Sequence, residues 1–467
     1  MTSNEPAENR FLTGPLPSLF VGTALPIILI MGTNGLLTVV DAYFLGEFVG
    51  ADALAAVTLM FPLYMLMTAC ATLVSGGMAS VLARQLGAGD ITAARRTFVA
   101  AQCLALIVCV ILIGLFALGG RRLALLLADG SVALAASGYA YISLLVWFSP
   151  LAFTLAINSD ALRCEGRLGF MTLASLTVSL TNVAFNYLLI VVLDFGVVGS
   201  AAGTVLAQVT ALAAIIVYRS GNAPALRLRD LAVDGWNRGW SRFLALGAPQ
   251  SLSFVGIALG STAIIAAVQM WNSDSYAATV AAYGIITRLL TFTFLPMLGL
   301  SMAAQTVIGN NFGAGLWHRS DAGLKLALGA ALTYAAIVQL VFWAASGRIG
   351  FVFVDDPETA GEVARILPVM TAMYALAGPQ MILAGYFQAI GDAGRAAILS
   401  LTRTYVFAIP LTFILPSLLG ERGIWIASPA SEAAMIAVAT VVLWQARAST
   451  GHRYGLFRAT RQQPVSA

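Results

Sequence analysis

The sequence predicts an all-α polytopic membrane protein, with 12 transmembrane helices arranged as two six-helix, pseudo-symmetric lobes. Three observations lead to this prediction. The composition is too apolar for a water-soluble fold, the apolar residues gather in runs long enough to cross a bilayer, and the second half of the chain repeats features of the first.

The composition excludes a water-soluble enzyme. Of the 467 residues, 59% are hydrophobic and only 10% are charged, and the mean hydropathy is +0.87. Soluble domains are about 45–50% apolar and about 25% charged, so a soluble fold could not bury this much apolar surface. The scarcity of charge also argues against a disordered chain. The four cysteines are scattered and show neither metal-binding nor redox spacing.

Twelve apolar runs are separated by charged residues or by Gly, Pro, Asn and Asp. They lie near residues 17–44, 53–83, 97–119, 132–157, 170–193, 197–218, 243–271, 277–308, 324–346, 366–391, 396–420 and 423–446. Because a spanning helix needs about 20 mostly apolar residues, we expect twelve helices joined by short loops. The first run contains Pro26 and lacks a convincing cleavage site, so we expect a retained helix rather than a signal peptide.

The basic residues predict the orientation of these helices, because cytoplasmic loops carry the excess of Lys and Arg. With the N-terminus inside, 18 of the 25 Lys and Arg residues fall on the cytoplasmic side and five on the other side. The remaining two, Arg288 and Arg403, lie inside apolar runs. We therefore expect a multi-pass protein of the cell (inner) membrane with both termini in the cytoplasm. The net charge of +4 fits contact with anionic lipid and gives no reason to expect a nucleic-acid partner.

The second half of the chain repeats features of the first at a nearly constant offset. The matches are Pro26 with Pro249, Ala55-Ala56 with Ala281-Ala282, Gly87-Ala88-Gly89 with Gly313-Ala314-Gly315, Gly166 with Gly391, Ser175-Leu176 with Ser400-Leu401 and Gly199 with Gly423, at offsets of 223 to 226. Parallel six-helix repeats occur in secondary transporters, with the substrate path between the halves. We expect an N-terminal lobe at 1–218, a cytoplasmic interlobe linker at 219–242, a C-terminal lobe at 243–446 and a basic cytoplasmic tail at 447–467.

Two acidic residues fall within apolar runs, Asp41 in the first and Glu432 in the twelfth. A carboxylate at mid-helix costs about 2.5–3.5 kcal/mol on insertion scales, so each needs a reason to be there. Asn182 and Asn186 share one face of the fifth helix because they are four positions apart, and Thr204 lies in the sixth helix. With Asp41 they supply oxygens that suit a hard cation or that hydrogen-bond a protonated acid. Alternatively, Asp41 snorkels to the outer surface and the two amides only join neighbouring helices.

The repeat serves as an internal comparison for this polar cluster. At the repeat offset, the counterparts of Asp41, Asn182 and Asn186 are apolar, and only Thr204 keeps a polar match, Ser428. This difference favours a specialised site in the first lobe over packing common to both lobes.

The other intramembrane charges have several interpretations. Glu432 could pair with Arg288 in the second lobe, or line the central cavity and attract cationic cargo. We therefore take Glu432 and Arg288 as candidate substrate-cavity residues. Arg403 lies one to two turns from the cytoplasmic end of its run and is expected to snorkel.

Several segments carry a family resemblance. They are Leu25-Pro26, Val40-Asp41-Ala42-Tyr43-Phe44-Leu45-Gly46, Ala53-Leu54-Ala55-Ala56-Val57, Ala83-Arg84-Gln85-Leu86-Gly87-Ala88-Gly89-Asp90, Gly196-Val197-Val198-Gly199-Ser200-Ala201-Ala202-Gly203-Thr204 and Gly309-Asn310-Asn311-Phe312-Gly313-Ala314-Gly315. Together they resemble the multidrug and toxic compound extrusion (MATE) transporters over nearly the whole chain. The resemblance implies an antiporter with two six-helix lobes around a V-shaped cavity. Such an antiporter exports amphipathic, cationic drugs or metabolites by alternating access against an inward flow of H⁺ or Na⁺.

The resemblance also assigns roles to particular residues. It implies that Asp41, Asn182, Asn186 and Thr204 form the ion- or proton-coupling site of the first lobe, and that Pro26 marks a bend in the first helix. We expect no catalytic residue, no metal beyond a Na⁺ ion at Asp41, and no cofactor other than the coupling ion, H⁺ or Na⁺. The expected partners are a small organic cation and the lipid bilayer, and we expect a monomer.

The sequence departs from the family pattern at the charged positions. Many relatives carry a second Asp where this chain has Asn186, so one charge of the site is missing. Other relatives use a Glu in the seventh helix and an Asp in the tenth, where this chain offers Gln250 and Gln380 but no acid. Coupling through the second lobe by that route is therefore not expected.

Other functions stay open at this point. A lipid-linked saccharide flippase of the same superfamily would need several basic residues in its cavity, where only Arg288 and Arg403 qualify. A major-facilitator transporter is disfavoured because the loop between the second and third spans lacks an Asp-Arg-x-Gly-Arg pattern. A membrane-embedded lipid-modifying enzyme would need grouped acids or a metal cluster at a membrane face. The only such group is Asp355, Asp356, Glu358 and Glu362.

Overall fold

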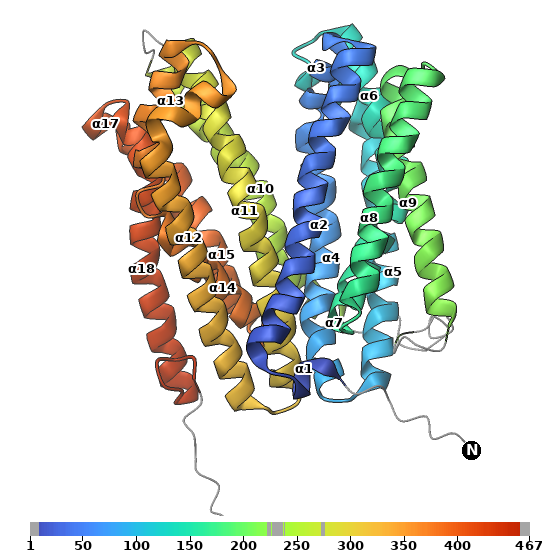
Figure 1. Ribbon diagram of the computed structural model, residues 1–467, viewed down its shortest axis with the longest axis vertical. Coiled ribbons are helices and arrows are strands. Elements are labelled where there is room, and N and C mark those ends of the chain that lie inside the picture. Colours follow the sequence, from blue (N-terminus) through green and yellow to red (C-terminus); the bar gives the residue numbers. More distant parts are fainter. Residues whose placement is uncertain (1–8, 222–225, 227–236, 238, 272–275, 458–467) are drawn as a thin grey trace, which may run out of the picture. The chain divides into compact units, whose positions relative to one another are not determined.

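The computed structural model of the protein describes residues 9–221, 226, 237, 239–271 and 276–457 (Figure 1). Over these ranges the chain is built of helices, and its sole β feature is an isolated bridge between Arg453 and Phe457. The expected all-α fold is therefore confirmed. Most of the expected interlobe linker at 219–242, and the tail beyond residue 457, lie outside the described residues.

The chain divides into two compact units. The first consists of Met1–Arg10 and Leu25–Val255, and the second of Phe11–Ala24 and Gly256–Ala467. The helices that contribute to the first unit are α2 (Leu16–Phe44), η1 (Leu45–Val49), α3 (Ala51–Leu59), α4 (Phe61–Gly87), α5 (Ile91–Leu127), α6 (Val132–Trp147), α7 (Ser149–Cys164), α8 (Leu168–Asn186), η2 (Tyr187–Val192), α9 (Gly196–Ser220) and the first half of α10 (Trp240–Met270).

The second unit begins with the short helix α1 (Arg10–Thr13) and the first turns of α2. Its other helices are the second half of α10, α11 (Tyr276–Gly313), α12 (Trp317–Phe353), α13 (Pro357–Met370), α14 (Tyr374–Ile390), α15 (Ala393–Leu401), η4 (Thr402–Ala408), α16 (Ile409–Ile414), α17 (Pro416–Leu419) and α18 (Arg422–Thr450). Within each unit the long helices lie side by side (Figure 1).

The described residues hold ten helices that are long and apolar enough to cross a membrane, and twelve if each of two bent pairs forms one span. The bent pairs are α6 with α7, at 52°, and α13 with α14, at 51°. The expected span at 53–83 is not one helix. It breaks at Met60 into α3 and α4, because Pro62 at the start of α4 favours a new first turn over the interior of a longer helix.

The repeat extends to backbone conformation. Both bent pairs are the fourth span of their half. Gly89 and Gly315, 226 positions apart, both adopt φ +72° in corresponding loops. Gly166 and Gly391, 225 positions apart, also adopt left-handed φ values, +75° and +92°. Because L side chains rarely adopt these angles, the glycines matched by sequence share a geometric role in the two halves.

Among the described residues, three spans contain π-helical segments, which are rare and often occur at functional sites. η1 begins four residues after Asp41, η2 begins directly after Asn186, and η4 contains Arg403. Each segment therefore adjoins or contains a polar residue that the sequence places inside the membrane.

The first described residues of the tail are docked on the second unit. Tyr386 on α14 donates a hydrogen bond from Oη to the carbonyl of Leu456 at 2.9 Å. Gly455 lies so close to α18 that a Cβ there would be 2.1 Å from the Leu443 carbonyl oxygen. The Lys325 ammonium lies 4.9 Å from the centre of the Phe457 ring. The tail thus continues as a packed segment to Phe457.

Candidate ion site and cavity in the first unit

The structure brings together the four polar residues that the sequence singled out. Asp41 lies near the end of α2 and is half-buried, and Asn182 and Asn186 are buried on the last turns of α8. Thr204 lies on α9, which packs along α8. The i, i+4 spacing of the two amides directs both toward the same neighbours, as the sequence predicts.

Hydrogen bonds connect the four side chains in a linear network. Asn186 Nδ2 donates to Asp41 Oδ1 at 2.5 Å and to Asn182 Oδ1 at 3.1 Å. Asn182 Nδ2 donates to Thr204 Oγ1 at 3.0 Å, and Thr204 Oγ1 donates to the Ser200 carbonyl at 3.2 Å. The carboxylate is therefore fixed by an amide rather than free to turn toward solvent, which disfavours the snorkelling interpretation of Asp41.

The orientation of the Asn182 amide decides which groups meet at Asp41. In this arrangement Asn182 Oδ1 lies 3.0 Å from Asp41 Oδ1, and two acceptors meet unless a proton or cation joins them. Rotating the Asn182 amide by 180° is the other solution: its nitrogen then donates to Asp41, and its oxygen accepts from Thr204 at 3.0 Å. In either case, Asn186 Oδ1 is buried and has no hydrogen-bond partner among the residues described.

The donor set fits a proton or Na⁺. A carboxylate, two amide oxygens and a hydroxyl are hard oxygen ligands of the kind that alkali and alkaline-earth cations take. A proton on Asp41 would instead donate to Asn182 Oδ1 and remove the contact between two acceptors.

A glycine that the sequence did not single out for a role makes this packing possible. A Cβ on Gly203 would lie 2.3 Å from Asn186 Oδ1. A Cβ on Gly199, one turn earlier, would lie 3.1 Å from the Leu189 carbonyl oxygen. Small residues let spanning helices approach closely, so these glycines allow α9 to bring Thr204 up to the Asn pair.

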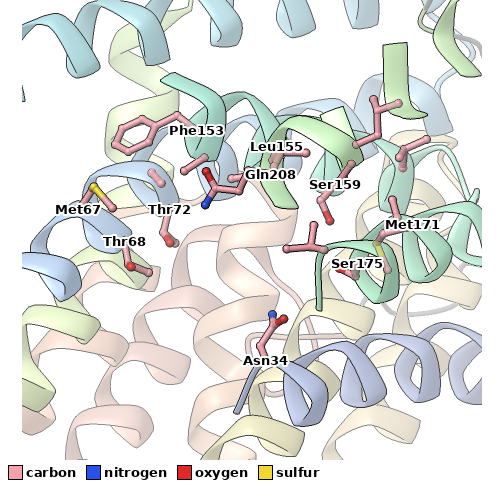
Figure 2. Close-up of a pocket in the computed structure, with 18 of the residues that line it drawn as sticks. Asn34, Met67, Thr68, Thr72, Phe153, Leu155, Ser159, Met171, Ser175 and Gln208 are labelled. Carbon is pink, nitrogen blue, oxygen red and sulfur yellow. The ribbon is translucent and has the colours of Figure 1, made fainter. Parts of the chain in front are cut away.

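A cavity of about 340 Å³ lies within the first unit (Figure 2). Its lining comes from α2, α4, α7, α8 and α9, and Figure 2 shows polar side chains from these helices, including Asn34, Thr68, Ser159 and Gln208, around one space. Apolar and sulfur-bearing side chains complete the wall: the lining also contains Met67, Phe153, Leu155 and Met171. Among the described residues that line the cavity, none carries a charged side chain.

The cavity and the polar cluster share faces of the same helices. Asn34 and Asp41 are seven positions apart on α2, Val178 and Asn182 are four apart on α8, and Thr204 and Gln208 are four apart on α9. These spacings place each pair on one helix face, with axial separations of about 6–10 Å. The Asp41 carboxylate therefore lies about two turns from the cavity along α2, and Asn182 and Thr204 lie about one turn from it along α8 and α9.

The remaining intramembrane charges are placed differently from the expectation. Glu432 pairs with Arg403, whose Nε lies 2.6 Å from Glu432 Oε1, and not with Arg288. Arg288 on α11 is exposed, and none of the described residues forms an ion pair with it. Arg403, which is expected to snorkel, is partly exposed and also forms an ion pair with the buried acid of α18.

The two glutamines at the family's acidic positions are both involved in packing. Gln250 on α10 lies against Gly76 of α4, where a Cβ would be 2.9 Å from Gln250 Oε1. Gln380 Nε2 on α14 donates to the Glu432 carbonyl at 3.3 Å.

The acidic group at 355–362 stabilises local structure. Asp356 caps α13 and accepts hydrogen bonds from the Thr359 hydroxyl and amide, which hold the pKa of the Asp356 carboxyl below its ordinary value. Arg365 binds both Glu362 and Glu421. Over the part of the chain that the structure describes, no three His, Cys, Asp or Glu residues are grouped to hold a metal. Two of its four members, Asp356 and Glu362, are therefore engaged in a helix cap and an ion pair.

Comparison with known proteins agrees with this architecture. The MatE family model matches residues 26–188 and 249–414, more than half of the chain. The multidrug export protein MepA of Staphylococcus aureus (strain NCTC 8325 / PS 47) is 25% identical over 414 residues, covering 87% of each chain. The probable multidrug resistance protein YoeA of Bacillus subtilis (strain 168) is 24% identical over 449 residues, covering 92% of this chain and 94% of YoeA.

The fold is also similar to solved structures. A multidrug resistance MATE family transporter of the MOP superfamily, in an outward-facing conformation, matches with a TM-score of 0.85. The match covers 95% of this chain and 99% of the other, at 23% sequence identity. Because the family model matches both halves of the sequence and the helical architecture agrees, the chain belongs to the MatE family, a family of transporters and not of enzymes.

Proposed function

We propose that the protein exports amphipathic, cationic drugs or metabolites across the membrane in exchange for H⁺ or Na⁺. The names of MepA and YoeA, a multidrug export protein and a probable multidrug resistance protein, support drug export as the general function. The observation that carries the coupling is that Asp41 lies on the same face of α2 as Asn34, which lines an uncharged amphipathic cavity about two turns away.

Electrostatics couples the two sites in this proposal. When Asp41 is ionised, it attracts a cation in the cavity. Two unit charges about 10 Å apart interact by about 1.7 kcal/mol at an effective dielectric constant of 20. When a proton or Na⁺ neutralises Asp41, that attraction disappears and the cation is held more than tenfold less tightly. The ion and the cargo therefore compete without sharing an atom.

Alternating access turns this competition into transport. An ion shifts the balance between two conformations only by binding them with different affinities. In the proposal, the outward-facing state takes up the ion at Asp41 and releases the cargo, and the neutralised unit favours closure to the inside. Pro26 lies in α2, the helix that also carries Asn34 and Asp41. A bend there would move both groups together.

Neither alternative function gains support from the geometry. A lipid-linked saccharide flippase would bind pyrophosphate, but the lining of the cavity contains no Lys, Arg or His. A lipid-modifying enzyme would need the acidic group at 355–362, whose members Asp356 and Glu362 are taken up by a helix cap and an ion pair.

We further propose that the protein lies in the cell (inner) membrane as a monomer with both termini in the cytoplasm. The distribution of 18 basic residues to one side and five to the other supports this orientation. The presence of both halves in one chain supports the monomer. Fluorescent-protein fusions at each terminus test the orientation, because such fusions are fluorescent only on the cytoplasmic side.

The test of coupling is ethidium efflux from membrane vesicles, driven separately by a pH gradient and by a Na⁺ gradient. The variant Asp41→Asn is expected to lose ion-driven efflux, because an amide neither binds a proton nor carries charge. Glu47→Gln is the matched control, since Glu47 is an exposed carboxylate six residues further along the same span. Undiminished ion-driven efflux by Asp41→Asn would refute the assignment, and the gradient that drives wild-type efflux identifies the ion.

A further inference from the structure

The second unit contains an ion pair within its spanning helices. Arg403 belongs to the π-helical segment η4, inside the span Ala393–Leu419, and Glu432 belongs to α18. Arg403 Nε lies 2.6 Å from Glu432 Oε1. Charged residues at this depth are costly, and where they are retained they often mark substrate or ion pathways.

The two members of the pair are unequally accessible. The Arg403 side chain is 44% exposed and that of Glu432 only 4%. Glu432 Oε2 is fully buried, and a ligand cannot reach it without displacing protein atoms. A molecule that approaches this pair therefore meets a guanidinium rather than a carboxylate.

The guanidinium has spare hydrogen-bonding capacity. The contact with Glu432 is made through Nε, and no other described residue forms a hydrogen bond or an ion pair with Arg403. The N–H donors of the two Nη groups are therefore available to a ligand. The planar fork of an arginine matches the two oxygens of a carboxylate, and such charge-assisted pairs are about twice as strong as neutral hydrogen bonds.

The surrounding structure packs against the two helical segments that carry the pair. Gln380 Nε2 donates to the Glu432 carbonyl at 3.3 Å. Gly256 of α10 packs against η4, where a Cβ would lie 3.0 Å from Thr404 Cγ2. Glu432 is thus a positioning residue that holds Arg403 in place while remaining buried.

We propose that Arg403 binds the carboxylate of zwitterionic cargo, meaning organic cations that also carry an acid group. The inference rests on the proposed export function and extends its substrate class. The first-unit cavity has no charged lining residue, so it offers no group that discriminates for a carboxylate. The guanidinium of Arg403 is a group of that kind within the second unit.

Two dyes that differ only in the acid group test the proposal. Rhodamine 110 carries a free carboxylic acid, and rhodamine 123 is its methyl ester. Binding of each dye to the detergent-purified full-length protein is followed by fluorescence anisotropy, and export of each dye is followed in proteoliposomes. The variants are Arg403→Gln, which removes charge and fork, and Arg403→Lys, which keeps only the charge. Arg422→Gln is the control, because Arg422 is an exposed arginine at the start of α18.

The expected result is selective. Arg403→Gln should weaken rhodamine 110 binding about tenfold or more, as loss of a charge-assisted pair predicts, with rhodamine 123 binding changed less than twofold. Arg403→Lys should be intermediate, and Arg422→Gln should bind both dyes as wild type does. An equal effect on the two dyes, or no effect on either, would overturn the inference. If binding shows the selective pattern but wild type exports neither dye, the export proposal fails and the carboxylate site stands.

Discussion

At the scale of single residues, the candidate site depends on close approach as much as on charge. Asp41 supplies the ionisable group, but its geometry comes from Asn186, and Asn186 fits only because residue 203 has no side chain. Adding one methyl group at Gly203 should therefore disturb the site, although Gly203 itself contacts no ion.

The variant Gly203→Ala is therefore expected to impair coupling without unfolding the protein. Its Cβ would overlap Asn186 Oδ1 and displace the amide from Asp41. Losing a hydrogen bond to a charged group removes about 1.5–3 kcal/mol, so ion affinity should change about tenfold or more. The affinity for Na⁺ should fall because a ligand is displaced, whereas the affinity for H⁺ should rise because the ionised carboxylate loses a donor. The dependence of ethidium efflux on the concentration of the driving ion measures this change. Gly169→Ala on α8 is the control, because a Cβ there meets nothing within 4 Å. Normal ion affinity in Gly203→Ala would contradict the packing argument.

At the scale of elements, α4 and α10 of the first unit cross at two glycines. A Cβ on Gly77 would lie 2.0 Å from the Phe243 carbonyl oxygen, and a Cβ on Gly247 would lie 1.8 Å from the Leu73 carbonyl oxygen. Each glycine faces the backbone of the other helix, which cannot yield as a flexible side chain can. The crossing thus holds the first half of α10 against α4, whose residues line the cavity.

The variant Gly247→Ala tests this crossing. Ala normally stabilises a helix interior by about 0.5–1 kcal/mol relative to Gly, but overpacking typically costs about 1–3 kcal/mol, so we expect a lower melting temperature in detergent. Gly260→Ala, on the same helix with nothing within 4 Å of a new Cβ, should melt at the wild-type temperature or slightly above. Equal melting of the two variants would mean that the helices do not cross this closely.

The helices were predictable from the sequence where the signal is local. The amide pair Asn182 and Asn186 was recognisable because i, i+4 spacing defines a helix face whatever surrounds it. The break at Met60 was missed because the run 53–83 is uniformly apolar and only Pro62 marks the new helix.

The residue contacts between helices could not be read from the sequence. The partner of Glu432 is Arg403 rather than Arg288, and that choice depends on which faces of α18, η4 and α11 meet. The segment η4 adds to the difficulty, because a π-helical segment shifts the register of every following side chain relative to a 3.6-residue period. The role of Gly203 could not be predicted either, because it depends on the contact between Gly203 on α9 and Asn186 on α8.

At the scale of the whole molecule, a site with one carboxylate limits the charge that one transport cycle moves. If one monovalent ion enters at Asp41 for each monovalent cation that leaves, no net charge crosses the membrane. The exchange is then driven by the ion gradient alone and not by the membrane potential. Asn186 is decisive here, because an acid at this position would add a second charge to the site.

We predict that wild-type export of ethidium in proteoliposomes is independent of a potential imposed with potassium and valinomycin. In Asn186→Asp, two ions can enter for each cation that leaves, and moving one net charge inward gains about 2.3 kcal/mol per 100 mV. Export out of the lumen by this variant should therefore rise steeply with an inside-negative potential. Potential-dependent export by the wild type would show that more than one charge is coupled to each cation.

The docked tail has a practical consequence for monitoring movement. Tyr386 belongs to α14, one half of a bent span, and its hydroxyl holds the Leu456 carbonyl. If α14 changes its angle to α13, the segment ending at Phe457 must follow or detach. A fluorophore placed on the exposed residue Tyr454 would then act as an optical reporter attached to that helix. The same contact limits how far the chain can be shortened. A truncation that removes Leu456 and Phe457 would break the hydrogen bond to Tyr386 and expose this part of α14, whereas a tag fused after Phe457 would leave the contact intact.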